Sequence, residues 1–422
     1  MNIKKSLVLA AAVATAVAAP GAFATNGYFA HGFGVRAQGM GGVGVALPQD
    51  ALAAATNPAG MALVGNRIDV GVTLFRPDRA TAITGNATAG NNIEFSPNND
   101  PVFFVPEFGY NKMISSTTSF GVSVYGNGGL NTDYTRNIPL FGTSPAGIDL
   151  SQLFIAPTMA WKLSDTNTVG VSLNLAYQRI EIKGLENFNT AAQSSAPGSV
   201  TNNGYDTSTG VGVRIGWIGQ ITPDVALGAT YQSETKMSKF SKYKGLFAEQ
   251  GDFDIPSNYA VGIAVKASPK TVVGFDVERI NYTDVKAVSN PLGPAPGGTL
   301  TNTLGTNNGA GFGWRDMTVY KIGVSHQYND KFTVRAGWNH GKQPIPAGET
   351  FFNLLAPGVV EDHLTLGATW NYSKDMEISA GYMHAFTKEV KGSNSIPLSF
   401  NGGEANLRMQ QNSFGVGLAW KM

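Results

Sequence analysis

Apolar and small polar residues alternate with a period of two over most of the chain. In residues 168–178, which read TVGVSLNLAYQ, Val, Leu and Tyr take every second position, and small or uncharged polar residues take the others. A period of two is the repeat of a β-strand whose two faces meet different surroundings. The pattern therefore predicts an all-β protein.

This rhythm predicts fourteen strands, at 66–77, 102–112, 117–126, 149–163, 167–183, 208–221, 224–236, 253–267, 270–283, 314–328, 331–342, 359–371, 375–389 and 405–421. Short links alternate with long ones. The long links cover about 78–101, 127–148, 184–207, 237–252, 284–313, 343–358 and 390–404. Periplasmic turns and extracellular loops of an up-and-down membrane barrel alternate in this way.

A soluble sandwich also alternates, so composition and aromatic placement must separate the two classes. Charged residues make up 14% of the chain, against about 25% in soluble domains. The chain has 52 Gly and no Cys, so disulfides cannot stabilise it. Aromatic residues lie near strand ends on the apolar face, as in the interface girdles of membrane barrels: Tyr177, Tyr231, Trp338, Trp370 and Tyr382. These features favour an outer-membrane, antiparallel, transmembrane β-barrel.

The first residues predict export. Lys4 and Lys5 precede an apolar run from Leu7 to Ala19, and a small-residue cleavage site ends at Ala24. This is the layout of a secretory signal peptide over residues 1–24, and its apolar run is too short to span a bilayer as a helix. Export and the strand pattern together predict a multi-pass protein of the outer membrane of a Gram-negative bacterium.

Residues 25–65 precede the first strand and are not needed for the barrel wall, which would occupy 66–422. They are rich in Gly and Ala, poor in charge, and contain the turn dipeptide Asn57–Pro58. About eight strands are filled by their own side chains, so a barrel of fourteen leaves an open lumen. We expect residues 25–65 to form a compact hatch in that lumen; a flexible tail is the alternative.

Several motifs in this region belong together. They are Gly27–Tyr28, Gly32–Phe33–Gly34, Asp50 before an Ala-rich stretch, and Asn57–Pro58–Ala59–Gly60 just before the first strand. With them, the stretch 26–77 resembles the start of the FadL-type outer-membrane transport family, which carries long-chain fatty acids and aromatic or aliphatic hydrocarbons. The C-terminus departs from the family pattern, because the terminal aromatic is displaced inward to Trp420.

The resemblance implies a route for the ligand. Extracellular loops capture it, a pocket in the barrel holds it against the N-terminus of the hatch, and it leaves sideways through a kink in the third strand. The matching strand is 117–126, followed by Tyr125 to Gly129. Tyr28 and Phe29 would then form the hatch tip that touches ligand, or simply pack against the wall. Asn57 and Pro58 would contact ligand or only shape the hatch.

Inward-facing cations are further candidates for ligand binding. Arg214, Lys321 and Arg335 fall on the small-residue face of their strands, so they should point into the lumen. Either a substrate carboxylate or an inward acid such as Asp276 or Glu278 can pair with them.

The predicted outer loop that begins at residue 237 contains KFSKYKGLF, which mixes basic and aromatic residues: Lys239, Phe240, Tyr243, Lys244 and Phe247. This mixture suits capture of an amphipathic anion, and it equally suits lipopolysaccharide phosphates.

Other classes of function have weaker support. Gly39 to Gly44 match GxGxxG, but they follow a predicted signal peptide rather than a strand of a βαβ unit, so no nucleotide cofactor is predicted. The 30 basic and 29 acidic residues give no support to nucleic-acid binding. The five His are scattered and no HExxH or GxSxG occurs, so neither an enzyme nor a metal site is predicted.

The sequence thus predicts a monomeric barrel for passive uptake of hydrophobic compounds, with long-chain fatty acids as the first candidate. A general diffusion porin for small polar solutes and a surface adhesin or structural barrel are the alternatives. A porin should carry charged constriction residues and have no N-terminal plug.

Overall fold

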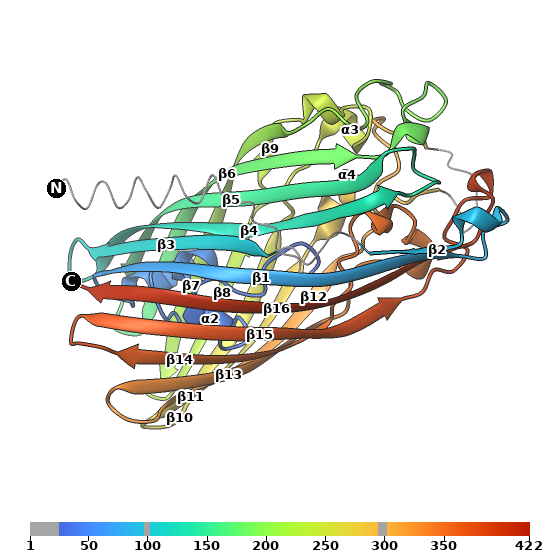
Figure 1. Ribbon diagram of the computed structural model, residues 1–422. Coiled ribbons are helices and arrows are strands. Elements are labelled where there is room, and N and C mark those ends of the chain that lie inside the picture. The colour runs from blue at the N-terminus through green and yellow to red at the C-terminus, as the bar shows by residue number, and fades with distance from the viewer. Residues whose placement is uncertain (1–24, 97–101, 294–301) are drawn as a thin grey trace.

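The computed structural model describes residues 25–96, 102–293 and 302–422, so the predicted signal peptide 1–24 lies outside the described residues. Fourteen strands form a closed antiparallel β-barrel (Figure 1). The wall strands are β1 (Arg67–Thr84), β3 (Phe103–Met113), β4 (Thr118–Asn137), β5 (Pro145–Lys162), β6 (Asn167–Lys183), β7 (Asp206–Thr222), β8 (Val225–Gln232), β10 (Asn258–Ser268), β11 (Thr271–Ile280), β12 (Met317–Gln327), β13 (Phe332–Gly341), β14 (Asp362–Asn371), β15 (Met376–Val390) and β16 (Glu404–Lys421).

The first and last wall strands close the barrel. β1 pairs with β16 along its whole length, from Arg67 opposite Lys421 to Thr84 opposite Glu404. Closure is required in a bilayer, because each unpaired backbone group at a free edge in hydrocarbon would cost several kcal/mol. Two further short strands are not part of the fourteen-stranded wall: β2 (Ile93–Phe95) pairs with β1, and β9 (Lys236–Met237) pairs with β7. The predicted fold class is confirmed.

The predicted strand ends differ from the structure most at two places, and smaller shifts occur at the start of β5, the end of β8 and the starts of β10 and β12. β1 continues seven residues beyond its predicted end at Pro77, and β4 runs to Asn137 rather than ending at residue 126. Part of the predicted loop 78–101 and most of the predicted loop 127–148 are therefore strand. The prediction stopped at residues that usually break strands, a proline and the run Gly126 to Gly129. Pairing with β16 carries β1 through Pro77, and a β-bulge between Gly126 and Gly128 carries β4 through the glycines.

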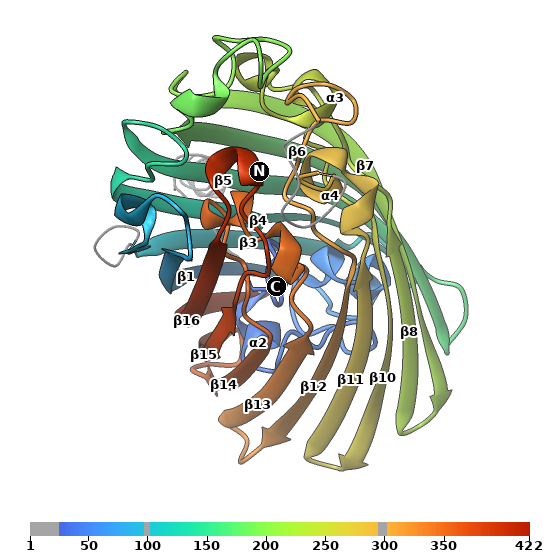
Figure 2. The ribbon, with the colours of Figure 1, turned by 90° about the vertical axis from the view of Figure 1, so that its right-hand side faces the viewer.

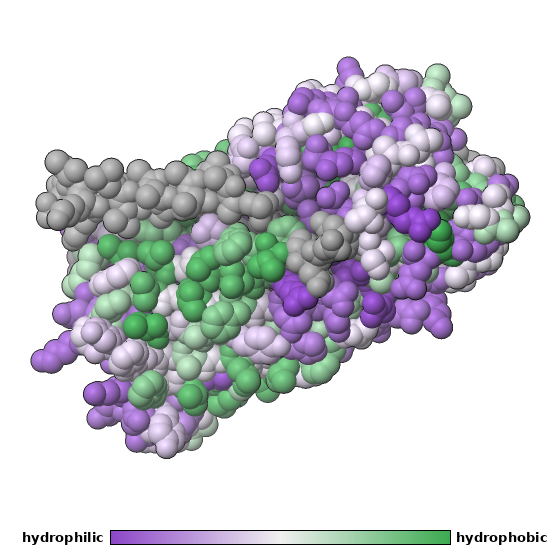
Figure 3. Space-filling model, in the orientation of Figure 1, coloured by the Kyte–Doolittle hydropathy of each residue, from purple (hydrophilic) through white to green (hydrophobic). Residues whose placement is uncertain are grey.

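The outer face of the barrel is apolar. Figure 3 shows hydrophobic residues across the wall, with hydrophilic residues toward both ends. Tyr231, Trp338, Trp370 and Tyr382 point outward, each more than a third exposed, and Tyr177 is half-buried. Within the described ranges, no helix has the length and hydropathy needed to cross a membrane.

Residues 25–65, called here the N-terminal segment, lie inside the ring of strands (blue in Figure 2) and are almost entirely buried. They form α2 (Val35–Gln38), η1 (Ala53–Ala55) and η2 (Pro58–Ala62), joined by irregular backbone. Glycines on the wall allow the segment to approach closely: a Cβ on Gly367 of β14 would lie 3.0 Å from the Cα of Gly39. The small residues on the inward face of the strands thus leave room for the N-terminal segment to pack in the lumen.

Short helices and loops cover the other end of the barrel, at the right of Figure 1. They are η3 (Ala89–Asn91), η4 (Glu186–Phe188), η5 (Ser241–Tyr243), α3 (Ala248–Gly251), η6 (Tyr282–Asp284), α4 (Lys286–Ser289), η7 (Ala347–Glu349), η8 (Phe352–Leu354) and η9 (Leu398–Phe400). The short turns lie at the opposite end, beside the C-terminus. This arrangement matches the predicted alternation of short and long links.

Candidate functional site

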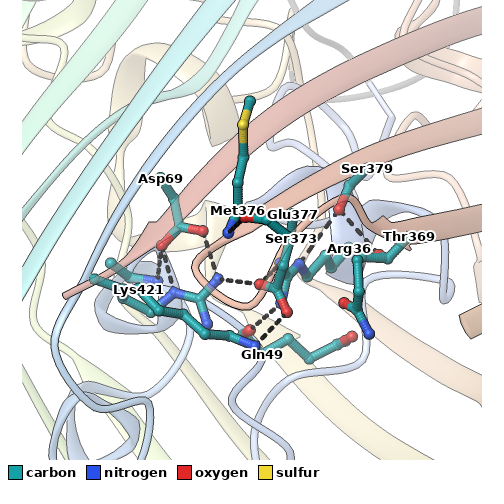
Figure 4. A network of polar contacts seen from close by, with 12 residues as sticks. Arg36, Gln49, Asp69, Thr369, Ser373, Met376, Glu377, Ser379 and Lys421 are labelled. Atoms are coloured by element: carbon teal, nitrogen blue, oxygen red, sulfur yellow. Dashed lines mark hydrogen bonds and ion pairs between the residues drawn. The ribbon is translucent and has the colours of Figure 1, made fainter. Parts of the chain in front are cut away.

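An ion network fastens the N-terminal segment to the wall (Figure 4). The carboxylate of Glu377 on β15 accepts hydrogen bonds from Arg36 of the segment, from Arg67 at 3.3 Å and from Lys421 at 2.8 Å. Arg67 also donates to Asp69 at 2.7 Å. Removing one member of such a buried group leaves an uncompensated charge, which is strongly destabilising. Arg36 is therefore a fixed point of the segment.

Wall carboxylates also bind the irregular backbone of the segment. Glu107 on β3 accepts from the amides of Gly34 at 3.0 Å and Val35 at 2.9 Å. Asp276 on β11 accepts from the amides of Gly44 and Val45, at 2.8 and 3.0 Å. Buried amides outside regular structure need such partners. Sequence reasoning missed Glu107, although its inward position on an alternating strand was visible.

The beginning of the segment forms a tip that pairs with β4. The amide of Ala30 donates to the carbonyl of Asn127 at 3.1 Å, and the amide of Gly129 donates to the carbonyl of Tyr28 at 3.0 Å. These bonds lie at the β-bulge of β4. The tip therefore contacts the strand that the family resemblance matches to the kinked third strand.

The hydrogen-bonded pairing of the wall strands is interrupted beside this tip. β3 pairs with β4 only from Met113–Ser119 to Phe108–Val124, whereas β3 continues to Phe103 as a partner of β1. The hydrogen-bond ladder between β3 and β4 thus ends next to the bulge. We call the region between residues 103–107 of β3 and the bulge the β3–β4 gap.

Aromatic rings surround the tip. The ring centroid of Tyr28 lies 5.1 Å from that of Tyr282, 5.8 Å from Trp314 and 6.3 Å from Phe253. The ring of Phe253 in turn lies 5.1 Å from Phe247. Such spacings are those of interacting aromatic pairs. A continuous row of packed aromatic rings, called here the aromatic path, therefore connects the tip to the outer loops.

Phe247 also lines an apolar pocket between these loops, called here the outer pocket. Its empty space, which includes open solvent, amounts to about 400 Å³, and it is lined by Ile182, Leu185, Phe188, Leu246, Phe247, Ala287, Ala310, Gly311, Phe312, Phe352 and Leu355. An apolar ligand entering it would remove apolar surface from water, which is favourable.

The basic and the aromatic side chains of the predicted capture loop, residues 239–247, differ in their exposure to solvent. Phe240, Tyr243 and Phe247 are buried, whereas Lys239 and Lys244 are exposed to solvent. The aromatic side chains thus belong to the interior of the loop cap, and a role of either group in ligand capture stays a prediction.

The predicted inward cations do point inward, but they contact protein groups. Lys321 forms an ion pair with Glu278 at 2.8 Å, which is the lumen pairing considered as the alternative. Arg214 donates to the carbonyl of Thr56 at 3.0 Å, and Arg335 donates to the side chain of Gln49 at 2.8 Å. Both arginines therefore hold the N-terminal segment, and a contact with ligand stays a prediction.

Asn57 and Pro58 likewise shape the segment. The Asn57 side chain donates to the carbonyls of Val45 at 2.7 Å and Trp217 at 3.0 Å, and it accepts from the amide of Ala59 at 3.1 Å. Pro58 begins η2, where its missing amide hydrogen is not needed. These contacts serve packing of the segment against β7, and no described contact tests a role toward ligand.

Comparisons with known proteins agree with this architecture. A family model described as outer membrane protein transport protein (OMPP1/FadL/TodX) matches residues 10–421. The long-chain fatty acid transport protein of Escherichia coli K12 is 23% identical over 425 residues, covering 92% of this chain and 93% of the relative. The counterpart from Salmonella typhi is 23% identical over 426 residues, with the same coverage.

Two solved structures share the fold. The toluene transporter TodX of P. putida aligns with a TM-score of 0.72 at 16% identity, covering 93% of this chain and 99% of that one. A Pseudomonas aeruginosa FadL homologue aligns with a TM-score of 0.70 at 16% identity, covering 94% and 99%. The chain is therefore an outer-membrane β-barrel that belongs to the OMPP1/FadL/TodX family of outer membrane transport proteins.

Proposed function

We propose that the protein takes up hydrophobic compounds passively, with long-chain fatty acids as the first substrate class. The ligand enters the outer pocket, moves along the aromatic path to the tip, and leaves sideways through the β3–β4 gap into the bilayer. The likeness to the long-chain fatty acid transport proteins of Escherichia coli and Salmonella typhi supports the substrate class. A wall exit spares an apolar solute full passage through water.

The observation that carries this proposal is the coincidence of the tip, the bulge and the gap. The tip bonds to Asn127 and Gly129 of β4, close to where the ladder between β3 and β4 ends. A small displacement of the tip would therefore change access to the gap. In this proposal residues 25–65 act as the hatch and residues 66–422 as the barrel.

The general porin alternative has less support, because the buried N-terminal segment occupies the lumen. We further propose that the protein works as a monomer, since a single chain closes the barrel. We also propose that the exposed Lys239 and Lys244 contact lipopolysaccharide phosphates.

Uptake of labelled oleate and of labelled toluene by cells with and without the gene tests the proposal. We expect gene-dependent uptake of oleate. Gene-dependent uptake of toluene alone would be consistent with the same route through the barrel, but would show that arenes, and not fatty acids, are the substrates. No difference for either compound would refute transport and favour an adhesin or structural role.

A further inference from the structure

Arg79 is a buried cation without a partner. It lies on the inward face of β1, opposite Met409 of β16, and is 6% exposed. Among the residues that the structure describes, its guanidinium has no hydrogen-bond partner, and its Nε and Nη2 atoms are buried. Burying a charge in this way is unfavourable unless another group compensates it. The carboxylates of Asp78 and Asp133 act on Arg79 from nearby, but no described group pairs directly with its guanidinium.

Nearby groups are engaged elsewhere. The carboxylate of Asp78 accepts a hydrogen bond from Gln410 at 2.6 Å, and Asp133 lies 3.7 Å from the ammonium of Lys183. The hydroxyl of Tyr134 bonds to Thr81 at 2.9 Å and to the carbonyl of Leu354. None of these groups forms an ion pair or hydrogen bond with Arg79.

Other inward arginines differ from Arg79 in this respect. Arg36 and Arg67 bond to Glu377, Arg214 donates to Thr56, and Arg335 donates to Gln49. Within the described part of the chain, these four are tied into the protein. Arg79 therefore differs from these four arginines, because its guanidinium has no direct partner among the described residues.

Arg79 lines a narrow pocket whose empty space, about 290 Å³, includes open solvent. Apolar residues form most of the lining, among them Phe75, Leu130, Pro357 and Met409. The side-chain oxygen of Asn131, also in the lining, has no partner among the described residues. Rotation of this amide would present its NH₂ group as a second donor. The pocket thus combines an apolar lining with a local group of donors.

The pocket adjoins the proposed route. Gly129, another lining residue, donates its amide to the carbonyl of Tyr28 in the tip. Phe75 lies opposite Phe103 of β3, the strand that borders the gap. A ligand in the pocket would therefore lie beside both the tip and the β3–β4 gap.

We propose that Arg79 binds the carboxylate of an amphipathic substrate, whose tail lies against Phe75, Leu130 and Met409. A guanidinium can donate two parallel hydrogen bonds to a carboxylate, and desolvation strengthens this pairing. A neutral hydrocarbon cannot neutralise Arg79. The pocket therefore selects long-chain carboxylates over neutral compounds of the same length. This inference rests on the proposed uptake function.

Binding of oleate and of methyl oleate to the purified full-length protein tests the inference. A detergent with an uncharged head group leaves Arg79 free, and pH 8 keeps oleate ionised. We expect the wild type to bind oleate at least about tenfold more tightly than the ester, as a charge-assisted pair implies. Arg79→Gln should lose this preference without weakening ester binding, and Arg79→Lys should retain part of it.

Arg408→Gln is the matched control, because Arg408 is exposed on β16 directly before Met409. It should leave both affinities unchanged. Heat-dependent gel migration checks that each variant is folded. A folded Arg79→Gln protein that keeps the preference for oleate overturns the inference.

Should Arg79→Gln not fold, equal affinities of the wild type for oleate and the ester would overturn the inference instead. Equal binding of both compounds leaves the uptake proposal intact, whereas failure to bind either contradicts both proposals. The role of Arg79 and the transport function can therefore fail separately.

Discussion

The carbonyl oxygen of Tyr28 occupies the place where a side chain at position 128 would begin. A Cβ on Gly128 would lie 1.8 Å from this oxygen, which is far inside van der Waals contact. Only glycine therefore allows the tip of the N-terminal segment to pair with the bulge of β4. The glycine-rich run after Tyr125, which looks like a strand break in the sequence, is what joins the tip to the wall.

Gly128→Val should detach the tip while the barrel still forms, because the wall strands pair with one another and not through the tip. Two backbone hydrogen bonds would be lost, worth about 1 kcal/mol each. We expect exchange of the Ala30 and Gly129 amides to accelerate at least about tenfold, measured by hydrogen–deuterium exchange.

Gly126→Ala is the control for this variant, because its new Cβ would meet no atom of the tip: it would lie 3.1 Å from the Val105 side chain and 3.9 Å from the Gln152 carbonyl. Unchanged protection of both amides in Gly128→Val would contradict the close contact between the tip and β4.

The β3–β4 gap can be closed by a disulfide, since the chain has no natural cysteine. The same contact between positions 126 and 105 spans the gap. In the double variant Val105→Cys/Gly126→Cys, oxidation should reduce uptake of labelled oleate about tenfold or more, and a reductant should restore it. The physical reason is that a covalent bond would prevent the two strands from separating.

A cysteine pair at Val324 and Ala336, neighbours in the ladder between β12 and β13, provides the control. Its oxidation should not change uptake. Full uptake through the oxidised 105–126 pair would exclude this gap as the exit.

The sequence predicted the fourteen wall strands because the bilayer imposes a local pattern. An outward apolar face repeats every second residue, and neither long-range contacts nor the lumen disturb it. The same reasoning failed at Pro77, where pairing with β16 overrides a local strand breaker. The strand therefore seemed to end before Arg79, and its inward position was hidden in a supposed loop.

Contacts within the lumen could not be predicted, because they join residues far apart in the sequence. Arg36 and Glu377 are separated by 341 positions, and neither lies in a distinctive motif. Lys321 was recognised as an inward cation, but its choice of Glu278 rather than a ligand depends on register between strands. Local patterns identify which face a residue occupies and leave its partner open.

Glu377→Gln should loosen the N-terminal segment. Arg36, Arg67 and Lys421 would lose the carboxylate that they share, and breaking a buried ion pair typically costs about 3–5 kcal/mol. We expect faster hydrogen exchange near Arg36, with the barrel still folded. Glu389→Gln, an exposed position on the same strand, should have no such effect. Equal exchange in the two variants would show that the network does not hold the segment.

The segment should also respond to pH through Asp50. Burial, and then the nearby charge of Asp69, raise the pKa of Asp50 to about 6. Because its pKa in the unfolded chain is about 3.9, the folded state binds the extra proton between these values. Packing of the segment should therefore be more stable at pH 5 than at pH 8.

Hydrogen exchange of the segment, corrected for the intrinsic effect of pH, measures this difference. Asp50→Asn should reduce it, because an amide has no charge to lose and can still accept from Leu52, as the carboxylate does at 2.9 Å. Glu107 and Asp276, which bind other amides of the segment, keep their carboxyl groups in this variant. Greater protection at pH 8 in the wild type would contradict the sign of the effect.

Deleting residues 25–60 should give a folded barrel that leaks small polar solutes. The wall strands keep their neighbours, since the closed ladder does not include these residues. Glu107 and Asp276 would lose the amides that they bind, but water would enter the emptied lumen and hydrate both carboxylates. A lumen of fourteen strands is too wide to be filled by its own side chains. Swelling of liposomes in arabinose should therefore be faster with the deletion variant than with the full-length protein. Equal swelling rates for two equally folded proteins would mean that the segment does not close the lumen.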